Sequence, residues 1–236
     1  MVNKGKIGLV TGASSGIGFA IARALKSDNF KIIGVARRKD RMEELQLDPD
    51  DMQAGDLNSP EFQDSVVEHV YSKYGKCDYL FNCAGVMEVG TIEEMDIDKM
   101  ASMIRLNVES TFRLTYQMLK RFREQGSGHI INISSVLGTK VRPTAGAYAA
   151  TKYALEALSE ALRMELSGTD ILITCIEPGL VMTELHQNWK VHPRESMNIQ
   201  EPLDAGYIAE IVRFIMDQPA HVRIPKLMIL PKDQQI

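Results

Sequence analysis

The sequence predicts an α/β fold with a doubly wound parallel sheet, and two observations carry that prediction. Short apolar runs of the kind that form buried parallel strands alternate along the chain with helical stretches. A glycine-rich turn connects the first apolar run to the first helical stretch. Because parallel strands need right-handed crossovers, the alternating elements predict an open, doubly wound parallel sheet of about seven strands with helices on both faces. The Rossmann type of this sheet, with the order 3-2-1-4-5-6-7, is the expected one.

The expected strands are short runs rich in Ile, Val and Leu. They are residues 6–10, 31–36, 79–84, 129–134, 171–178 and 227–230, with a weaker strand at 51–55. Helices are expected between them, at 16–27, 60–74, 97–124, 148–167 and 203–217. The helix at 148–167 has the strongest pattern, because it is rich in Ala, Leu and Glu and its apolar residues recur every three or four positions. Sheets of this kind bind ligands at the carboxyl ends of their strands.

Composition indicates one globular domain over residues 1–236. The hydrophobic content of 44% is enough for a full core, and no repeat or low-complexity linker divides the chain. The net charge of -4 and the lack of a Lys/Arg block give no reason to expect nucleic acid or a membrane as a partner. No apolar stretch approaches the length needed to span a bilayer.

The cysteines and histidines do not suggest a metal site. Cys77, Cys83 and Cys175 have no metal-site spacing and are odd in number, so reduced thiols and a cytoplasmic location are expected. His186 and His192 have no matching ligand cluster nearby, and no metal is expected there.

The segment TGASSGIG at residues 11–18 places three glycines, Gly12, Gly16 and Gly18, between the first strand and the first helix. A turn without side chains lets backbone N–H groups approach a pyrophosphate at the positive end of the helix dipole. A flexible loop is the alternative. Strand, glycines and helix nevertheless come in the order that nucleotide binding requires.

Further motifs resemble those of the short-chain dehydrogenase/reductase family. The glycine spacing after Thr11 differs from the usual dinucleotide fingerprint and matches this family's variant. NCAG at 82–85 resembles the family's N-N-A-G, with Cys83 as the departure, and LNVES, NISS, YAATK and EPGLVMT resemble its later motifs in the same order. The segments IEPGLVMTEL and QPAHVRIPKLMILP further resemble the branch of NADP-dependent 3-hydroxy acid, or serine-type, dehydrogenases.

Tyr148 and Lys152 are four residues apart in an expected helix, so both side chains project from one face. A phenol with a pKa of about 10 is a poor base at neutral pH, and a fixed ammonium beside it favours the phenolate. We therefore expect Lys152 to lower the pKa of Tyr148, which then exchanges a proton with the oxygen of an alcohol or carbonyl. The alternative is an exposed lysine beside a packed tyrosine.

Two further residues complete the expected catalytic set. Ser135 ends a strand thirteen residues before Tyr148, where its hydroxyl can hold a substrate oxygen against the tyrosine. Ser134 competes for this role; strand alternation puts the two serines on opposite sides, and the family spacing favours Ser135. Asn107 is a poor helix former inside the helix expected at 97–124. The resemblance implies that it kinks this helix and holds a water that relays protons to Lys152, whereas a tolerated surface Asn is the alternative.

The resemblance also implies where a nicotinamide dinucleotide binds. The glycine turn would take the pyrophosphate, Asp56 the adenine amino group and Lys152 the ribose next to the nicotinamide, while Asp56 could instead be only a turn acid. The expected cofactor-binding residues are Thr11, Gly12, Ser14, Ser15, Gly16, Ile17, Gly18, Arg37, Arg38, Asp56, Leu57, Asn82, Ala84, Gly85, Asn107, Tyr148, Lys152, Pro178, Gly179, Val181 and Thr183.

Residues 36–38 favour NADP(H) as the dinucleotide. Ala36 ends the second strand, where NAD enzymes carry an acid for the ribose 2′-OH, and Arg37 and Arg38 follow it. Guanidinium groups bind a phosphate in a fork, and the family's usual position favours Arg37 over Arg38. A solvated basic turn, paired with Glu43 or Glu44, is the alternative.

Substrate-side expectations are less specific. Segment 184–202 is polar and links a strand to a helix, so it is either a substrate lid or a surface loop. A cation should face the carboxylate of a 3-hydroxy acid, and Arg142 and Arg194 are the candidates. The resemblance further implies a homodimer or homotetramer formed through the helices expected at 97–124 and 148–167.

Together these features predict an NADP(H)-dependent oxidoreductase that acts on a secondary alcohol or carbonyl of a small molecule, a 3-hydroxy acid or a related alcohol. One alternative is a carbonyl reductase like the 3-oxoacyl-[acyl-carrier-protein] reductases, for which no basic docking patch is located. The other is a non-catalytic NADP(H)-binding regulator. Such a protein would be expected to lose Tyr148 or Lys152, and this chain keeps both.

Overall fold

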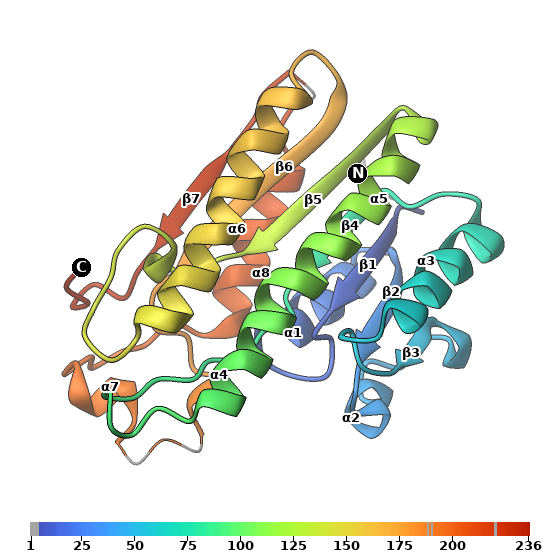
Figure 1. Ribbon diagram of the computed structural model, residues 1–236. Coiled ribbons are helices and arrows are strands. Elements are labelled where there is room, and N and C mark those ends of the chain that lie inside the picture. Colours follow the sequence, from blue (N-terminus) through green and yellow to red (C-terminus); the bar gives the residue numbers. More distant parts are fainter. Residues whose placement is uncertain (1–4, 188, 190, 220) are drawn as a thin grey trace.

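The computed structural model describes residues 5–187, 189, 191–219 and 221–236, and it contains a seven-stranded parallel sheet in the order β3-β2-β1-β4-β5-β6-β7 (Figure 1). Residues 1–4 of the expected domain and residues 188 and 190 of the expected lid lie outside the described residues. The strands are β1 (Ile7–Thr11), β2 (Lys31–Ala36), β3 (Met52–Ala54), β4 (Tyr79–Asn82), β5 (Ser127–Ile133), β6 (Asp170–Pro178) and β7 (Lys226–Ile229). This confirms the predicted fold class and strand order.

Helices cover both faces of the sheet (Figure 1). On one face, α1 (Gly16–Ser27) and α8 (Ala205–Met216) pack their apolar residues against the strands. On the other face, α3 (Pro60–Tyr74), α5 (Thr111–Gln125) and α6 (Gly146–Glu165) do the same. The winding reverses between β1 and β4, where Val10 pairs with Phe81. A ligand crevice is therefore expected at the carboxyl ends of these two strands.

The helix expected at 97–124 is interrupted. It consists of α4 (Ile97–Ile104), a π-helical turn at Arg105–Ser110 and α5. The side chain of Asn107 makes hydrogen bonds with the backbone of Val86, in the loop after β4. A side chain that reaches out of a helix in this way is a common companion of π-turns.

Smaller differences concern element ends and short helices. The strand expected at 79–84 ends at Asn82, α6 begins two residues earlier than expected, and α8 is shorter than expected at both ends. Short helices that the sequence analysis did not predict are α2 (Lys39–Glu43), α7 (Pro193–Ser196) and the 3₁₀ turns Pro49–Asp51, Val136–Gly138 and Glu184–His186. Among the described residues, every helix is too short or too polar to cross a bilayer.

Candidate active site

A cavity of about 530 Å³ lies at the carboxyl ends of the central strands. It is lined by most of the residues that the sequence singled out. These are Gly12, Ser14, Ser15, Gly16, Ile17, Gly18, Arg37, Arg38, Asp56, Leu57, Ala84, Gly85, Ser135, Tyr148, Lys152, Pro178, Gly179, Val181 and Thr183. Thr11, Asn82 and Asn107 are not on its wall and have supporting contacts behind it.

The glycine turn brings backbone segments too close together for side chains. Gly12 has a φ of 69°, and a Cβ there would lie 2.9 Å from the backbone nitrogen of Ala84. A Cβ on Gly18 would lie 2.5 Å from the carbonyl oxygen of Gly12. Only glycine permits both the left-handed turn and the close packing of α1 on it.

The first turn of α1 fits an anionic group. Ser15 begins the helix without a side-chain hydrogen bond to it, and the first turn carries no acidic residue. The N–H groups of a helix start have no partner within the helix and form the positive end of its dipole. Together with the glycine turn, this end of the cavity suits the pyrophosphate of a dinucleotide.

Thr11 holds the crevice together from behind. Its hydroxyl donates to the carbonyl of Phe81 at 3.2 Å and accepts from the backbone nitrogens of Cys83 and Ala84 at 3.0 and 3.1 Å. One buried side chain thus ties the end of β1 to the loop after β4. We interpret Thr11 as setting the position of the cavity wall that Cys83 and Ala84 form.

The side chain of Asn82 lies behind the cavity wall. Its amide donates to the side chains of Thr115 at 3.1 Å and Asn132 at 2.8 Å, and the residue is buried. The side chain therefore lies on the α5 face of β4, and the expected part of Asn82 in cofactor binding stays a prediction.

Asn107 joins the π-turn to the loop after β4. Its Oδ1 accepts from the Val86 nitrogen at 3.0 Å, and its Nδ2 donates to the Val86 carbonyl at 2.8 Å and to the Thr151 hydroxyl at 3.3 Å. Lys152 is the next residue after Thr151, so Asn107 supports the segment of α6 that carries the catalytic pair. The helix break that the resemblance implied is present at this residue.

Tyr148 and Lys152 meet on one face of α6, but their pKa values differ from the expectation. Burial raises the pKa of Tyr148 to about 12, and a hydrogen bond with Ser135 only partly offsets this. Burial lowers the pKa of Lys152 to about 8. Burial is thus the dominant influence on Tyr148, and the predicted lowering of its pKa is wrong. The reason is that Lys152 Nζ donates to the carbonyl of Ile133 at 2.9 Å and lies 5.8 Å from the Tyr148 ring centroid.

Ser135 and Ser134 have different surroundings. The Ser135 hydroxyl hydrogen bonds with Tyr148 and accepts from the backbone nitrogen of Leu137 at 3.1 Å. The Ser134 hydroxyl is buried and has no hydrogen-bond partner among the described residues. The geometry thus favours Ser135 as the serine that works with Tyr148.

The basic residues that follow β2 lie beside the start of α1. Arg38 donates to the Ser15 hydroxyl at 2.8 Å and pairs with Glu184 at 2.7 Å. Arg41 lies 3.7 Å from the same carboxylate. Arg37 lines the cavity and is exposed. Arg38 thus pairs with Glu184, far away in the sequence, whereas the neighbouring Glu44 lies 3.9 Å from Arg41.

Asp56 forms a turn at the edge of the cavity. Its carboxylate accepts from the backbone nitrogen of Asn58 at 2.9 Å. This contact is the turn role considered as the alternative, and it leaves the second carboxylate oxygen for other contacts. Asp56 also borders the cavity, so the turn role and a role toward an adenine are compatible.

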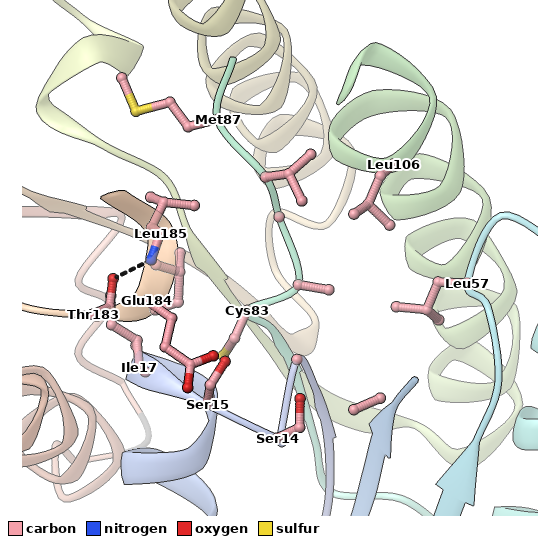
Figure 2. A pocket seen from close by; sticks show the side chains of 18 of the residues that line it. Ser14, Ser15, Ile17, Leu57, Cys83, Met87, Leu106, Thr183, Glu184 and Leu185 are labelled. Atoms are coloured by element: carbon pink, nitrogen blue, oxygen red, sulfur yellow. Dashed lines mark hydrogen bonds between the residues drawn. The ribbon is translucent and has the colours of Figure 1, made fainter. Parts of the chain in front are cut away.

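The segment after β6 closes one side of the cavity, as Figure 2 shows for Thr183, Glu184 and Leu185. The Thr183 hydroxyl accepts from the Leu185 nitrogen at 3.3 Å and begins the 3₁₀ turn Glu184–His186. A single parallel bridge between Val181 and Leu203 closes the base of the segment. The segment expected to be a substrate lid or a surface loop thus contains a short helix, α7, and its role as a lid stays a prediction.

The two candidate cations for a substrate carboxylate have different positions. Arg142 is close enough to Tyr148 and His186 to affect the pKa of both, and burial lowers its own pKa. Its Nη1 also contacts the sulfur of Met197 in the segment after β6 at 2.7 Å. Arg194 donates to the carbonyl of Gln200 and has no recorded effect on Tyr148, and neither arginine is on the cavity wall. The structure thus favours Arg142 over Arg194.

Several residues on the cavity wall were missed by the sequence analysis (Figure 2). They are apolar residues of the loop after β4 and of the π-turn, among them Val86, Met87 and Leu106. The cavity is also lined by Glu184, Leu185, His186 and Gln187, which belong to the segment that the sequence analysis expected to be a lid or a surface loop. Single residues in loops carry no periodic pattern, so no sequence signal distinguishes them from a plain surface. Among the described residues, no group of three or more His, Cys, Asp or Glu side chains could hold a metal ion.

Comparison with known proteins identifies the family to which this chain belongs. The family model for short chain dehydrogenases matches residues 6–193. An uncharacterized oxidoreductase of Staphylococcus aureus (strain MRSA252) is 34% identical over 230 residues, which are 96% of this chain and 97% of the relative.

Two solved structures share the whole fold. A closed form of serine dehydrogenase complexed with NADP+ has a TM-score of 0.89 at 28% identity, covering 98% of this chain and 96% of the other. A 3-ketoacyl-(acyl-carrier-protein) reductase from Brucella melitensis complexed with NADH has a TM-score of 0.87 at 26% identity, covering 96% and 97%. With the glycine turn, the Tyr148–Lys152 pair and the family model in agreement, the chain belongs to the short-chain dehydrogenase family and is an oxidoreductase.

Proposed function

We propose that this oxidoreductase transfers a hydride between NADP(H) and a secondary alcohol or carbonyl group, with a small 3-hydroxy acid or related alcohol as substrate. The observation that carries the proposal is the meeting of Ser135, Tyr148 and Lys152 in the same cavity as the glycine turn. One end of this cavity suits a dinucleotide, and the other offers a proton donor beside a hydroxyl that can hold an oxygen.

The cofactor would lie along the carboxyl edge of the sheet. Gly12, Gly16 and the start of α1 would hold the pyrophosphate, and Lys152 the ribose hydroxyls beside the nicotinamide. Pro178, Gly179, Val181 and Thr183 would line the nicotinamide end, since they border the cavity there. When bound, the cofactor supplies or accepts the hydride.

Tyr148 would act as the acid in carbonyl reduction. Its pKa of about 12 keeps the phenol protonated at neutral pH, so it can donate its proton to the oxygen of the carbonyl group as the hydride adds to carbon. The Ser135 hydroxyl, which hydrogen bonds with Tyr148, would orient that oxygen. Lys152, with a pKa of about 8, can exist in both protonation states near neutral pH and would return a proton to the phenolate.

Preference for NADP(H) over NAD(H) rests on the end of β2. Ala36 provides no carboxylate to bind a ribose 2′-OH or to repel a 2′-phosphate. Arg37 and Arg38 follow it and line the cavity. The planar guanidinium group of an arginine can bind a phosphate through two hydrogen bonds. The likeness to a serine dehydrogenase solved with NADP+ supports this assignment.

The substrate assignment has two supports. The chain resembles serine dehydrogenase over its whole length, and Arg142 lies close to Tyr148, where it could meet a carboxylate. The similar likeness to a 3-ketoacyl-(acyl-carrier-protein) reductase keeps acyl thioesters as the second candidate. A non-catalytic NADP(H)-binding regulator is the third, and the presence of the whole catalytic set argues against it.

Turnover with a panel of 3-hydroxy acids, acyl thioester alcohols and steroid alcohols, each with NADP+ and NAD+, tests the proposal. We expect Tyr148→Phe to abolish turnover while NADPH binding, followed by fluorescence, stays near the wild-type value. Lys152→Ala should impair both, because Lys152 serves the cofactor and the proton transfer. Near wild-type turnover in Tyr148→Phe would contradict the mechanism.

The same panel tests the substrate. Arg142→Ala should raise KM for a 3-hydroxy acid much more than KM for a neutral alcohol, and Arg194→Ala is the matched control. Equal effects of both variants on both substrates would rule out Arg142 as the carboxylate partner.

A further inference from the structure

A second cavity, of about 670 Å³, lies at the amino ends of the central strands. It is bordered by the first residues of β4, β5 and β6, by the end of α8 and by the loop before β7. The candidate active site lies at the carboxyl ends of the same sheet, and among the described residues the two cavities share no lining residue. A cavity of this size is large enough for a small organic molecule.

Pro225 explains why the sheet is open at this cavity. β7 pairs with β6 only from Lys226, which lies opposite Cys175. Proline has no N–H group, so Pro225 cannot extend the ladder toward the start of β6. Residues 170–174 of β6 therefore have no strand on their outer edge, and residues 223–225 pass them as a loop.

His129 brings a hydrogen-bond acceptor to the cavity. The residue lines the cavity and is only 7% exposed. The Thr174 hydroxyl donates to the carbonyl of Ile224 at 2.7 Å, so it must accept from His129 Nε2 at 3.0 Å. Burial lowers the pKa of His129 to about 4, which keeps the ring neutral at neutral pH. His129 Nδ1 is then an unprotonated acceptor, and within the described residues it has no hydrogen-bond partner.

Two arginines line the same cavity. Arg163 Nη1 donates to the carbonyl of Pro225 at 3.2 Å, and Arg223 Nη2 donates to the carbonyl of Thr169 at 2.6 Å. In the part of the chain that the structure describes, neither guanidinium pairs with a carboxylate. Each keeps further N–H groups that can bind a carboxylate of a ligand.

The rest of the lining suits an apolar ring with an acidic group. Lys6 lies 3.0 Å from Asp78 and neutralises it, so Asp170 is the remaining carboxylate against two arginines. The Tyr79 ring lies 5.9 Å from the His129 ring. Apolar side chains complete the wall, and they are Leu172, Ile215, Met216 and Val222.

We propose that this cavity is a second small-molecule site, which takes a small aromatic acid with a hydroxyl group. The carboxylate would bind Arg163 and Arg223, and the hydroxyl would donate to His129 Nδ1. β5 runs from this site to Ile133, whose carbonyl accepts from Lys152. The site is thus at the far end of a strand that supports the catalytic residues, and binding to it does not depend on the proposed function.

Isoleucine methyl NMR tests the site, with 4-hydroxybenzoate as the probe. The probe should shift the signals of Ile173, Ile215 and Ile224, which line the second cavity. The signals of Ile17 and Ile133 report any binding in the candidate active site. If the first three signals do not move, the proposal is wrong.

Two reference compounds test the assigned contacts. Methyl 4-hydroxybenzoate has no charge and should bind about 10- to 150-fold more weakly than the probe, because it loses the contact with the arginines. Benzoate has no hydroxyl and should bind about 2- to 10-fold more weakly. Equal affinity of all three compounds would contradict both contacts.

Variants assign the contacts to residues. His129→Gln keeps a partner for Thr174 and removes the acceptor at Nδ1, so it should weaken 4-hydroxybenzoate and leave benzoate unchanged. Arg163→Gln and Arg223→Gln should weaken both acids. Arg123→Gln, which changes an exposed arginine of α5 outside the cavity, is the matched control. Probe affinity that stays at the wild-type value in all three cavity variants, or an equal loss of both acids in His129→Gln, would overturn the assignment.

Discussion

Arg38 is held by Ser15 and Glu184 at the end of the cavity where we place the 2′-phosphate. A phosphate at this position would compete with Glu184 for the same guanidinium. Glu184 comes from the segment after β6, so one carboxylate links the cofactor end of the cavity to the segment that covers it. The pair is about one third exposed or more on each side, which keeps its strength modest.

Glu184→Gln should therefore strengthen NADP+ binding by about two- to fivefold, the range expected for release of an exposed ion pair. NAD+ lacks the phosphate, and its affinity should hardly change. Equilibrium titration of both cofactors measures this, with Glu44→Gln as the control because Glu44 pairs with Arg41. Weaker binding of both cofactors to Glu184→Gln would mean that Glu184 supports the cavity wall.

Arg37→Ala should weaken NADPH binding about 10- to 150-fold, because a hydrogen bond to a charged group contributes about 1.5–3 kcal/mol. NADH affinity should stay the same. Lys39→Ala removes an exposed cation two residues further on and serves as the control. Equal loss of both cofactors in Arg37→Ala, or a wild-type preference for NAD+, would show that Arg37 belongs to a solvated turn.

At the scale of elements, the π-turn at Arg105–Ser110 fastens the loop after β4 to the helix layer. Asn107 satisfies both the N–H and the C=O of Val86, as a partner strand would. Val86 lines the cavity, so this link fixes part of the cavity wall. The interruption of the helix is therefore needed to build the site.

Asn107→Ala should lower the free energy of unfolding by about 1–3 kcal/mol, because the Val86 groups lose their partners. It should also lower kcat, since the wall beside Lys152 loosens. Asn107→Asp keeps the acceptor for the Val86 N–H but loses the donor, so an intermediate effect is expected. Denaturant unfolding and kinetics measure both variants; an Ala variant as stable and as active as the wild type would contradict this account.

Elements with a periodic pattern could be predicted from the sequence, as α1 and α3 show with the expected ends. The glycine turn could be predicted too, because its order between strand and helix is local. The π-turn at Asn107 could not be located by pattern, since its cause is a partner 21 residues away. Glu184 and the orientation of Asn82 were missed for the same reason: their partners are fixed only when distant segments meet.

The prediction of a lowered pKa for Tyr148 was wrong for a different reason. The spacing to Lys152 correctly put both side chains on one face, but spacing does not report burial. Burial opposes the charged forms of both groups at once, and it raises the tyrosine pKa while it lowers the lysine pKa.

For the molecule as a whole, two buried histidines link stability to pH. Burial lowers the pKa of His129 and of His186 to about 4 from 6.5. A base with a depressed pKa stabilises the fold above the unfolded value and loses that contribution as pH falls toward the folded value. The protein should therefore lose stability between pH 6.5 and 4, by about 1.4 kcal/mol per pH unit for each histidine.

His129→Gln should make this loss shallower by about one proton, since the amide can still hydrogen bond with Thr174 as the ring does. Denaturant unfolding across this pH range checks the slope. His221→Gln changes an exposed histidine and should leave the slope as in the wild type. Identical slopes for His129→Gln and the wild type would mean that His129 is not protonated on unfolding in this range.

Cys83 stands where the family motif has an asparagine, and it puts sulfur on the cavity wall (Figure 2). Burial raises the pKa of this thiol to about 12, so at neutral pH only about one thiol in 10⁵ is the nucleophilic thiolate. Peroxides and alkylating reagents react with the thiolate. The cavity therefore contains a half-buried cysteine that stays a neutral thiol at neutral pH and reacts slowly with such reagents.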